Sequence, residues 1–190
     1  MSTIELQKQM TVEEFLALPE DGVDRELING VVREKAMTVR SESHSRAMAS
    51  TARHLGNWVA EFTCTKFEVL CGEAGFILDE VDRLVVGVDV AVNHMDRKDD
   101  DDHSHTTLVC GAPHLAVEIL SPSDTHKDVH EKIRLYLDHG VAAVWIVDPD
   151  DRTVRIYRRG QLPVFFNSDQ TLACEPELPG FSVRVHDLFR

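Results

Sequence analysis

VGVDVAV at residues 86–92 and LAVEIL at residues 115–120 are two short apolar runs, and each contains one carboxylate. Runs of this length and composition predict strands that are buried on both faces of a sheet. An ionised carboxylate in such a strand costs several kcal/mol unless a partner compensates its charge. Asp89 and Glu118 therefore each need a cation. A divalent metal shared by both would supply it, and so would the Arg or Lys of a structural salt bridge.

The segments around these runs predict helices and strands in mixed order. Helices are expected at 11–18, where Thr11 and Glu14 form a capping box, at 43–62, and from 121–124 to Gly140. A hairpin is expected at 24–33, around the turn Asn29-Gly30. Further strands are expected at 65–70, 75–78, 84–92, 114–120, 142–147 and 153–158, with edge strands at 162–166 and 181–185. The order predicts an α/β (α+β) fold with a central mixed sheet flanked by helices.

Composition predicts one globular domain over residues 1–190. The chain has 190 residues, a hydrophobic fraction of 43% and a net charge of −13, and it shows no internal repeat. Residues 95–106 hold four consecutive Asp and no apolar periodicity, which predicts a mobile acidic loop. No apolar run is long enough for a membrane span and no secretory signal precedes the domain, so a cytoplasmic location without membrane contact is expected.

Lys132 lies on the helix expected after the Glu118 strand. It flanks the apolar stripe of Val129 and Ile133, so it can lean back toward the sheet. Asp128 is four residues earlier and can pair with it. The alternative is a surface lysine in a helical ion pair, which would contribute only a few tenths of a kcal/mol.

The order and spacing of these residues resemble a known family. The matching segments are ELING at 26–30, Asp89, EILSPS at 118–123, DVHEK at 128–132 and WIVDP at 145–149. They are similar to the Uma-type restriction endonucleases of the PD-(D/E)XK nuclease superfamily. The similarity runs from Met10 to Phe181, almost the whole chain. It implies the restriction-endonuclease-like fold, with an N-terminal helix and hairpin and a metal site where two strands splay.

The resemblance also implies roles for individual residues. Asp89 and Glu118 would be the metal ligands, and their oxygen atoms suit Mg²⁺ or Mn²⁺. The superfamily often places its lysine two residues after the second acid, where this chain has Leu120. The family pattern moves that lysine to the following helix, which matches Lys132. Glu26 corresponds to the acid of the N-terminal hairpin that completes the site.

Two departures from the family pattern concern positions next to the site. Val88 stands where a proline often precedes the first Asp, and residues 142–144, AAV, replace a Pro-Glu-aromatic sequence. Neither change removes a proposed ligand. Asp128 would orient Lys132 without itself contacting the metal.

The expected function is metal-dependent hydrolysis of DNA phosphodiester bonds by an endonuclease, with Glu26, Asp89, Glu118 and Lys132 as the catalytic residues. A homodimer, with two sites for two DNA strands, follows from the resemblance. A catalytically silent dimeric accessory module of the same fold that associates with nucleic acid is the alternative. A purely structural acidic domain is a third, and it requires Asp89 and Glu118 to be salt-bridged away from any cleft.

Several histidines and arginines have two interpretations. His44 could reach the site or the substrate, or be a hydrated residue at a helix start. His94, His103, His105 and His114 with Cys110 could bind zinc, but their spacing matches no standard site, and none of the cysteines forms a CxxC pair. Arg152, Arg155, Arg158 and Arg159 lie on or beside a strand and form either a solvated edge or a phosphate-facing ridge. Arg155 is thus a candidate substrate contact.

Overall fold

The computed structural model describes residues 9–19, 21–35, 39–61, 67–95 and 106–190. In chain order its elements are α1 (Val12–Leu16), β1 (Asp24–Ile28), β2 (Val31–Lys35), α2 (Glu42–Glu61), β3 (Phe67–Asp79), β4 (Leu84–His94), β5 (Val109–Cys110), β6 (Leu115–Ile119), α3 (His126–Asp138), β7 (Ala143–Asp148), β8 (Thr153–Tyr157), β9 (Val164–Phe166), β10 (Thr171–Cys174), β11 (Leu178–Arg184) and the 3-10 helix η2 (Val185–Phe189).

The main sheet is mixed, as the sequence predicts. Its strands follow the order β2-β1-β4-β6-β7-β8-β9, and β3 pairs with β4 while β5 pairs with β3. β6 and β7 run parallel, whereas β4 pairs antiparallel with β1, β3 and β6. β10 and β11 form a separate hairpin that packs against the C-terminal part of α2.

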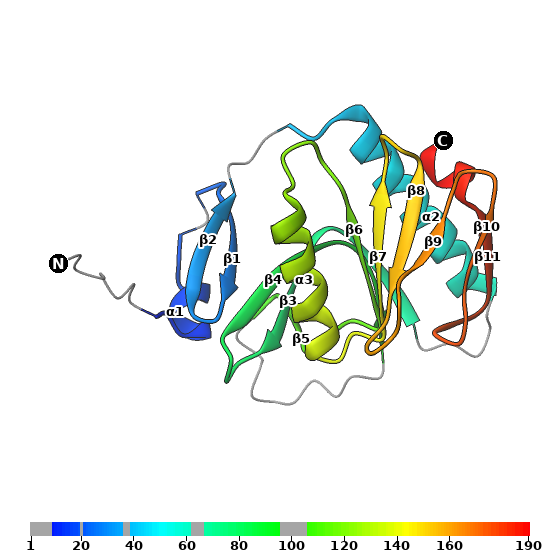
Figure 1. Cartoon of the computed structure of the whole chain (residues 1–190). Helices are drawn as coiled ribbons and strands as arrows, with labels where there is room; N and C mark the ends of the chain where they lie inside the picture. The colour runs from blue at the N-terminus through cyan, green and yellow to red at the C-terminus, as the bar shows by residue number, and fades with distance from the viewer. Residues whose placement is uncertain (1–8, 20, 36–38, 62–66, 96–105) are drawn as a thin grey trace.

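Helices cover the sheet on its two faces (Figure 1). On one face, Leu55 and Trp58 of α2 pack with Trp145 of β7 and with the β10–β11 hairpin. On the other face, Ile133 and Tyr136 of α3 pack against strands β4, β6 and β7. Burial of these large apolar side chains on both faces explains why the central strands are apolar almost throughout.

Several boundaries differ from the sequence predictions, and two of these differences concern β3 and α3. The segments expected as two strands at 65–70 and 75–78 form one strand, β3, because Gly72 and Glu73 take positive φ angles of 92° and 59° and make a β-bulge instead of a break. Helix α3 begins at His126 with Thr125 as its N-cap. Residues 121–124, where the helix was expected to begin, form a turn in which Asp124 accepts hydrogen bonds from Ser121.

The predicted acidic loop at 95–106 falls mostly on residues 96–105, which lie outside the described residues. The single-domain organisation stays a prediction. None of the described helices is long and apolar enough to cross a membrane.

Arg158 joins the main sheet to the β10–β11 hairpin. Its guanidinium donates to both carboxylate oxygens of Glu177, at 2.9 and 2.8 Å, and both side chains are 11% exposed. Arg158 is therefore not part of a phosphate-facing ridge. The hydrogen bonds of Arg158 outweigh the effect of burial and lower the pKa of Glu177 below its usual value.

Arg158→Ala should lower the free energy of unfolding by about 3 kcal/mol, because it leaves the Glu177 carboxylate buried without its partner. Arg159→Ala is the matched control, since the neighbouring Arg159 is 73% exposed and contacts Asp138 only at the surface. It should change stability by less than about 0.5 kcal/mol. Urea denaturation of both variants measures the difference, and equal losses would contradict this description of the Arg158–Glu177 pair.

Candidate active site

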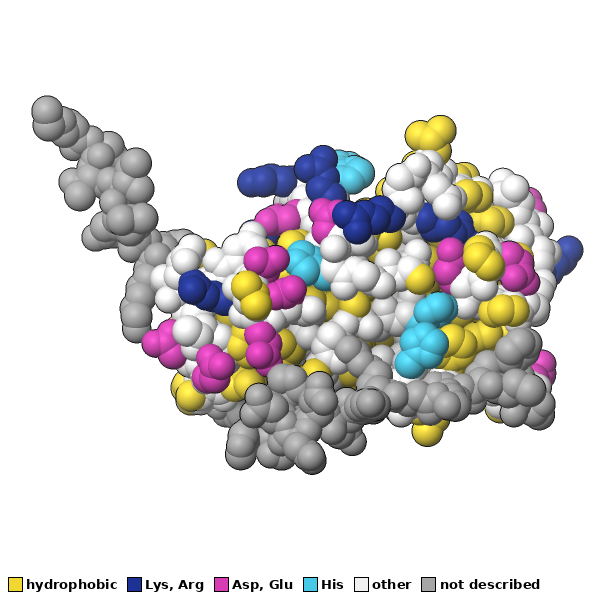
Figure 2. All heavy atoms as spheres, turned by 90° about the horizontal axis from the view of Figure 1, so that it is seen from below, with side chains coloured by type: hydrophobic (Ala, Val, Ile, Leu, Met, Phe, Trp, Pro, Cys, Tyr) yellow, Lys and Arg dark blue, Asp and Glu magenta, His cyan; other side chains and the backbone are white. Residues whose placement is uncertain are grey.

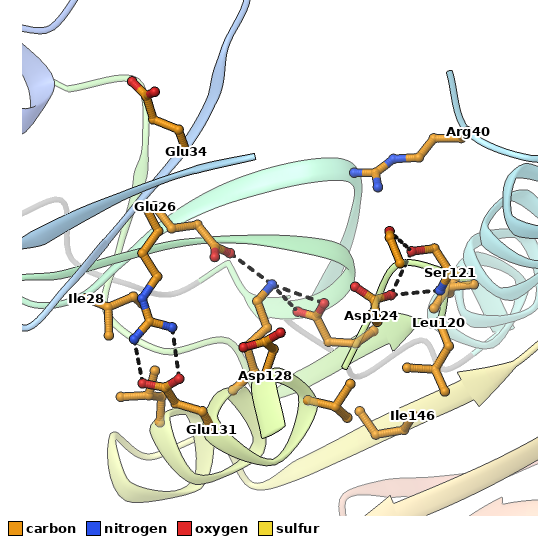
Figure 3. A pocket seen from close by; sticks show the side chains of 17 residues that line it. Glu26, Ile28, Glu34, Arg40, Leu120, Ser121, Asp124, Asp128, Glu131 and Ile146 are labelled. Atoms are coloured by element: carbon orange, nitrogen blue, oxygen red, sulfur yellow. Dashed lines mark hydrogen bonds and ion pairs between the residues drawn. The ribbon is translucent and has the colours of Figure 1, made fainter. Parts of the chain in front are cut away.

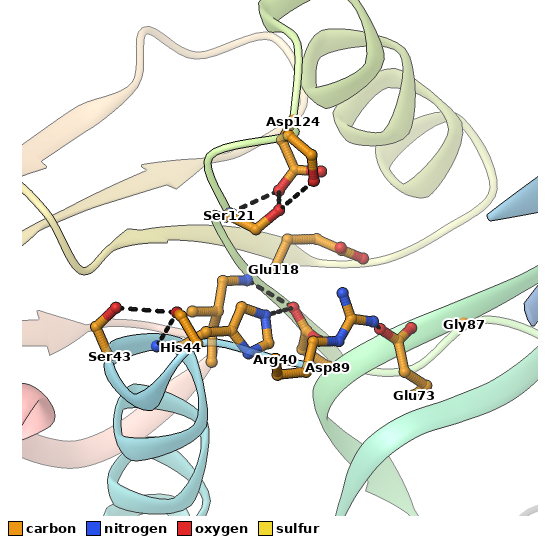
Figure 4. Close-up of polar contacts among 12 residues, drawn as sticks. Arg40, Ser43, His44, Glu73, Gly87, Asp89, Glu118, Ser121 and Asp124 are labelled. Carbon is orange, nitrogen blue, oxygen red and sulfur yellow. Dashed lines mark hydrogen bonds and ion pairs between the residues drawn. The ribbon is translucent and has the colours of Figure 1, made fainter. Parts of the chain in front are cut away.

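The site forms where strands β4 and β6 separate. Their ladder pairs Val92 with Leu115 and ends at Val90 and Val117. Asp89 and Glu118 are the next residues of the two strands. The Asp89 carboxylate accepts a hydrogen bond of 2.8 Å from the backbone N–H of Ile119. A side chain thus takes the place of the next backbone partner, and the two strands open into a fork that holds both carboxylates (Figure 4).

The β-bulge of β3 lies opposite Asp89. Cys71 pairs with Val90 and Ala74 pairs with Val88, so Gly72 and Glu73 share the position facing Asp89. Bulges of this kind redirect side chains beside functional sites. Here Glu73 reaches the guanidinium of Arg40, with which it forms an ion pair at the fork (Figure 4).

Gly87 is the backbone contact point of the site. Its carbonyl oxygen accepts from Lys132 Nζ and from the hydroxyl of Tyr136, each at 3.3 Å, and its N–H donates to Glu26 at 3.4 Å. A Cβ atom at this position would lie 2.9 Å from the Glu73 carboxylate. Glycine therefore allows the backbone of β4 to approach four polar side chains closely.

Lys132 lies between two of the predicted acids. Its Nζ atom is 2.9 Å from Glu26 Oε1 and 3.2 Å from Glu118 Oε2, and the three side chains are 10–15% exposed. The structure therefore brings Glu26 of β1, Glu118 of β6 and Lys132 of α3 together, although they lie up to 106 residues apart in the sequence.

Tyr136 is a member of this cluster that was not among the site residues predicted from the sequence. Its ring is fully buried, and its hydroxyl donates to Glu118 Oε1. Tyr136 lies one helical turn after Lys132, on the same side of α3. That spacing was the available signal, because a tyrosine buried beside a lysine needs a polar partner for its hydroxyl.

His44 approaches Asp89 from the opposite face of the sheet. It comes from the first turn of α2, its side chain is 2% exposed, and its Nε2 atom is 3.6 Å from Asp89 Oδ2 (Figure 4). This contact with Asp89 raises the pKa of His44 despite burial. His44 is thus a buried neighbour of the predicted metal ligand, and its contact with substrate stays a prediction.

Burial and neighbouring charges shift the pKa values of the acids in different directions. Burial raises the pKa of Glu118 to about 7, with a contribution from the negative charge of Asp89 and against the effect of Lys132. The pKa of Asp89 is lowered, because the contact with His44 and the hydrogen bond from the Ile119 N–H outweigh burial. Glu118 and Glu26 raise the pKa of Lys132 well above its usual value, although burial opposes them. Lys132 is therefore a cation at neutral pH.

A cavity of about 420 Å³ opens beside this cluster (Figure 3). Glu26, Glu118 and Lys132 line it together with aliphatic side chains and with further charged and polar side chains from several elements. Arg33 of β2 and Glu131 of α3 form a two-bonded ion pair at its rim, with distances of 2.6 and 2.9 Å. The β1–β2 hairpin is therefore fastened to α3 across the cavity.

Asp128 and Arg155 lie farther from the cluster. Asp128 lines the cavity, and its carboxylate accepts a hydrogen bond from the hydroxyl of Thr125. Its effect on Lys132 stays a prediction. Arg155 lies on β8, outside the lining of the cavity, with its guanidinium 5.9 Å from the ring centre of Phe165.

The residues at the fork fit a hard divalent cation. Asp89, Glu118 and Glu26 supply oxygen atoms, which are the ligands that Mg²⁺ and Mn²⁺ prefer. The carboxylates of Asp89 and Glu118 also repel each other, and a cation bound between them would remove this repulsion. In the structure Lys132 compensates the charge of Glu118.

A second group of metal-binding side chains lies at the C-terminal end of α3. Asp79 and Asp82 of the β3–β4 turn and His139 place one ligand atom each within 4.8 Å of one another. Among the described residues no other three His, Cys, Asp or Glu side chains place their ligand atoms this close together. The carboxylate oxygens of Asp89, Glu118 and Glu26 are therefore farther apart than 4.8 Å as a set. Sequence reasoning missed it because His139 is remote from the two acids in the chain.

The hypothetical zinc site is only partly described. His103 and His105 lie outside the described residues. His94 and His114 pack their rings 5.0 Å apart against Phe67, and His114 Nε2 is 2.7 Å from the Glu177 carbonyl oxygen. These two histidines therefore belong to an aromatic cluster at the end of β4.

The arrangement of sheet and helices is that of the restriction-endonuclease-like class of nuclease folds. The chain belongs to the Uma2 family, described as "Putative restriction endonuclease", whose sequence model matches residues 12–186. A crystal structure of "a putative nuclease belonging to DUF820" from Anabaena variabilis ATCC 29413 is similar, with 25% sequence identity and a TM-score of 0.78 over 95% of this chain and 97% of that one. No curated protein matches the chain.

The raised pKa of Glu118 predicts a pH-dependent loss of stability without metal. The folded state favours the protonated carboxyl between its usual pKa of 4.5 and about 7, so its stabilising contribution is complete below 4.5 and is lost as the pH rises through 7. Relative to Glu118→Gln, the unchanged protein should lose on the order of 3 kcal/mol across this range. Urea denaturation in EDTA measures the difference, with the exposed Glu61→Gln as control. A difference that does not change with pH would contradict the prediction.

Proposed function

We propose that this protein is an endonuclease that hydrolyses DNA phosphodiester bonds with the help of Mg²⁺ or Mn²⁺. The observation that carries the proposal is the convergence of Asp89, Glu118, Lys132 and Glu26 at the fork of β4 and β6, beside an open cavity. Family membership and the similar crystal structure support a nuclease. The metal and the DNA substrate are our inference from the chemistry of the side chains.

Asp89 and Glu118 would hold the metal ion, which when bound supplies a Lewis acid for the scissile phosphate and lowers the pKa of water. Asp89 is well prepared for this role, because the Ile119 N–H fixes its carboxylate and its lowered pKa keeps it ionised. Tyr136 fixes the orientation of Glu118 by its hydrogen bond.

Lys132 would stabilise negative charge on the phosphate or orient the attacking water. Its raised pKa means that it acts as a cation and hydrogen-bond donor, and not as a base. Glu26 and the Gly87 carbonyl oxygen hold its ammonium group in place independently of Glu118. Glu26 is thus a positioning residue for Lys132 in this mechanism.

DNA is the proposed substrate in spite of the net charge of −13. On the face shown in Figure 2, Lys and Arg side chains lie in small groups among Asp and Glu side chains, without a continuous basic band. Binding would therefore depend on local contacts at the site and weaken strongly with salt. A homodimer and a cytoplasmic location stay predictions.

Lys132→Ala should reduce the rate of Mn²⁺- or Mg²⁺-dependent nicking of supercoiled plasmid by at least about a hundredfold, because it removes the cation nearest the reacting phosphate. Lys127→Ala is the matched control, an exposed lysine on the same helix. It should retain activity within about threefold.

The purified protein, incubated with either metal and with EDTA, provides the baseline for this comparison. Nicking that persists in Lys132→Ala, or that is independent of metal, would refute the mechanism. Absence of nicking in the unchanged protein on every DNA form would favour the catalytically silent module.

A further inference from the structure

Four side chains form a row across the sheet from the proposed metal site to its edge. Glu118 of β6 pairs in register with Ile146 of β7, Ile146 pairs with Arg155 of β8, and Arg155 pairs with Phe165 of β9. Residues paired in register point to the same face of a sheet. With strands about 4.8 Å apart, the row from Glu118 to Phe165 is about 14 Å long.

The outer half of this row is exposed on the face that carries α3. In Figure 1, α3 lies over the β4 and β6 side of the sheet, whereas β8 and β9 lie beside it with no described helix in front of them. Phe165 is 51% exposed, and the guanidinium of Arg155, a half-buried residue, lies 5.9 Å from the centre of its ring. Among the described residues, no carboxylate pairs with Arg155. The row therefore ends in a cation and an aromatic ring that are both available to a ligand.

The inner half of the row belongs to the cavity of the active site. Glu118 and Ile146 both line it, together with Leu120 and Val129. Glu118 and Lys132 are only 15% exposed, so a phosphate must enter the cavity to reach them. Asp124 and Asp128 also line the cavity and would repel a second DNA strand, whereas Arg33 compensates the charge of Glu131 at the rim. One strand fits this entrance better than a duplex.

We propose that the protein acts on single-stranded or locally unpaired DNA, and that the strand runs from the cavity along this row. Arg155 contacts a phosphate and Phe165 stacks on a base. Exposed aromatic rings and arginines beside a groove are the usual elements of single-strand binding, because every base offers a face for stacking. The proposal rests on the nuclease function proposed above, and it names the form of the substrate.

Phe165→Ala tests the stacking contact directly. The probe is a fluorescein-labelled 12-nucleotide single strand, compared with the same sequence as a blunt duplex and with a strand of the same length whose sites are abasic. Binding is measured by anisotropy at low salt in EDTA. Phe165→Ala should weaken binding of the single strand about fivefold or more, whereas Phe165→Trp should retain it. The abasic strand should not respond to Phe165→Ala.

Two matched controls isolate the row. Val164→Ala removes an exposed apolar side chain from the same strand, but Val164 pairs with Ile156 and so points to the opposite face. It should leave single-strand binding unchanged. Arg155→Ala should weaken binding of the normal and the abasic strand equally, and Arg159→Ala should weaken neither by more than about twofold.

The outcomes separate this proposal from the nuclease function. Cleavage of DNA without any effect of Phe165→Ala on single-strand binding would refute strand binding along the row and leave the nuclease function intact. Phe165-dependent binding of single strands without cleavage would support strand binding along the row and refute the nuclease function. Equal binding of duplex and single strand, or no measurable binding of either, would refute the proposed single-strand preference. If sedimentation shows that the unchanged protein is a dimer and Phe165→Ala a monomer, with unchanged DNA binding, the surface binds a second copy of the chain. This result would also refute single-strand binding along the row.

Discussion

The hydrogen bond from the Ile119 N–H to the Asp89 carboxylate determines how β4 and β6 separate. It satisfies a backbone donor that the neighbouring strand no longer reaches, and it gives a buried carboxylate a fixed partner. Glu118 lies at the same level on the other strand, where Lys132 and Tyr136 compensate it. The opening of the sheet and the compensation of its two buried charges are therefore the same structural feature.

The remaining elements place groups around this opening. Helix α3 supplies Lys132 and Tyr136 from one face of the sheet, and α2 supplies His44 from the other. The β1–β2 hairpin supplies Glu26 and is held to α3 by the Arg33–Glu131 ion pair. The strongly acidic composition becomes compatible with a nuclease in this arrangement. The acids that matter are concentrated where a cation would be bound, and a bound metal would reverse the local charge.

The sequence was sufficient to predict the mixed sheet, and it singled out Asp89 and Glu118 because a carboxylate inside an apolar strand needs compensation whatever the fold. Their role as metal ligands stays a prediction. It also predicted that Lys132 leans toward the sheet, since helical periodicity places it beside the apolar stripe of α3. It could not distinguish a strand break from a bulge at Gly72, because both use glycine with positive φ. Contacts between remote segments, such as Asp79 with His139 or Arg158 with Glu177, depend on the packing of whole elements and left no local pattern.

The central claim is that Asp89 and Glu118 together hold a divalent cation. The most direct measurement is the anomalous difference map of a crystal of the full chain soaked with Mn²⁺. We expect a peak between β4 and β6, in contact with oxygen atoms of Asp89 and Glu118. A peak only at Asp79, Asp82 and His139, with Asp89 still bound to the Ile119 N–H and Glu118 still bound to Lys132, would contradict it.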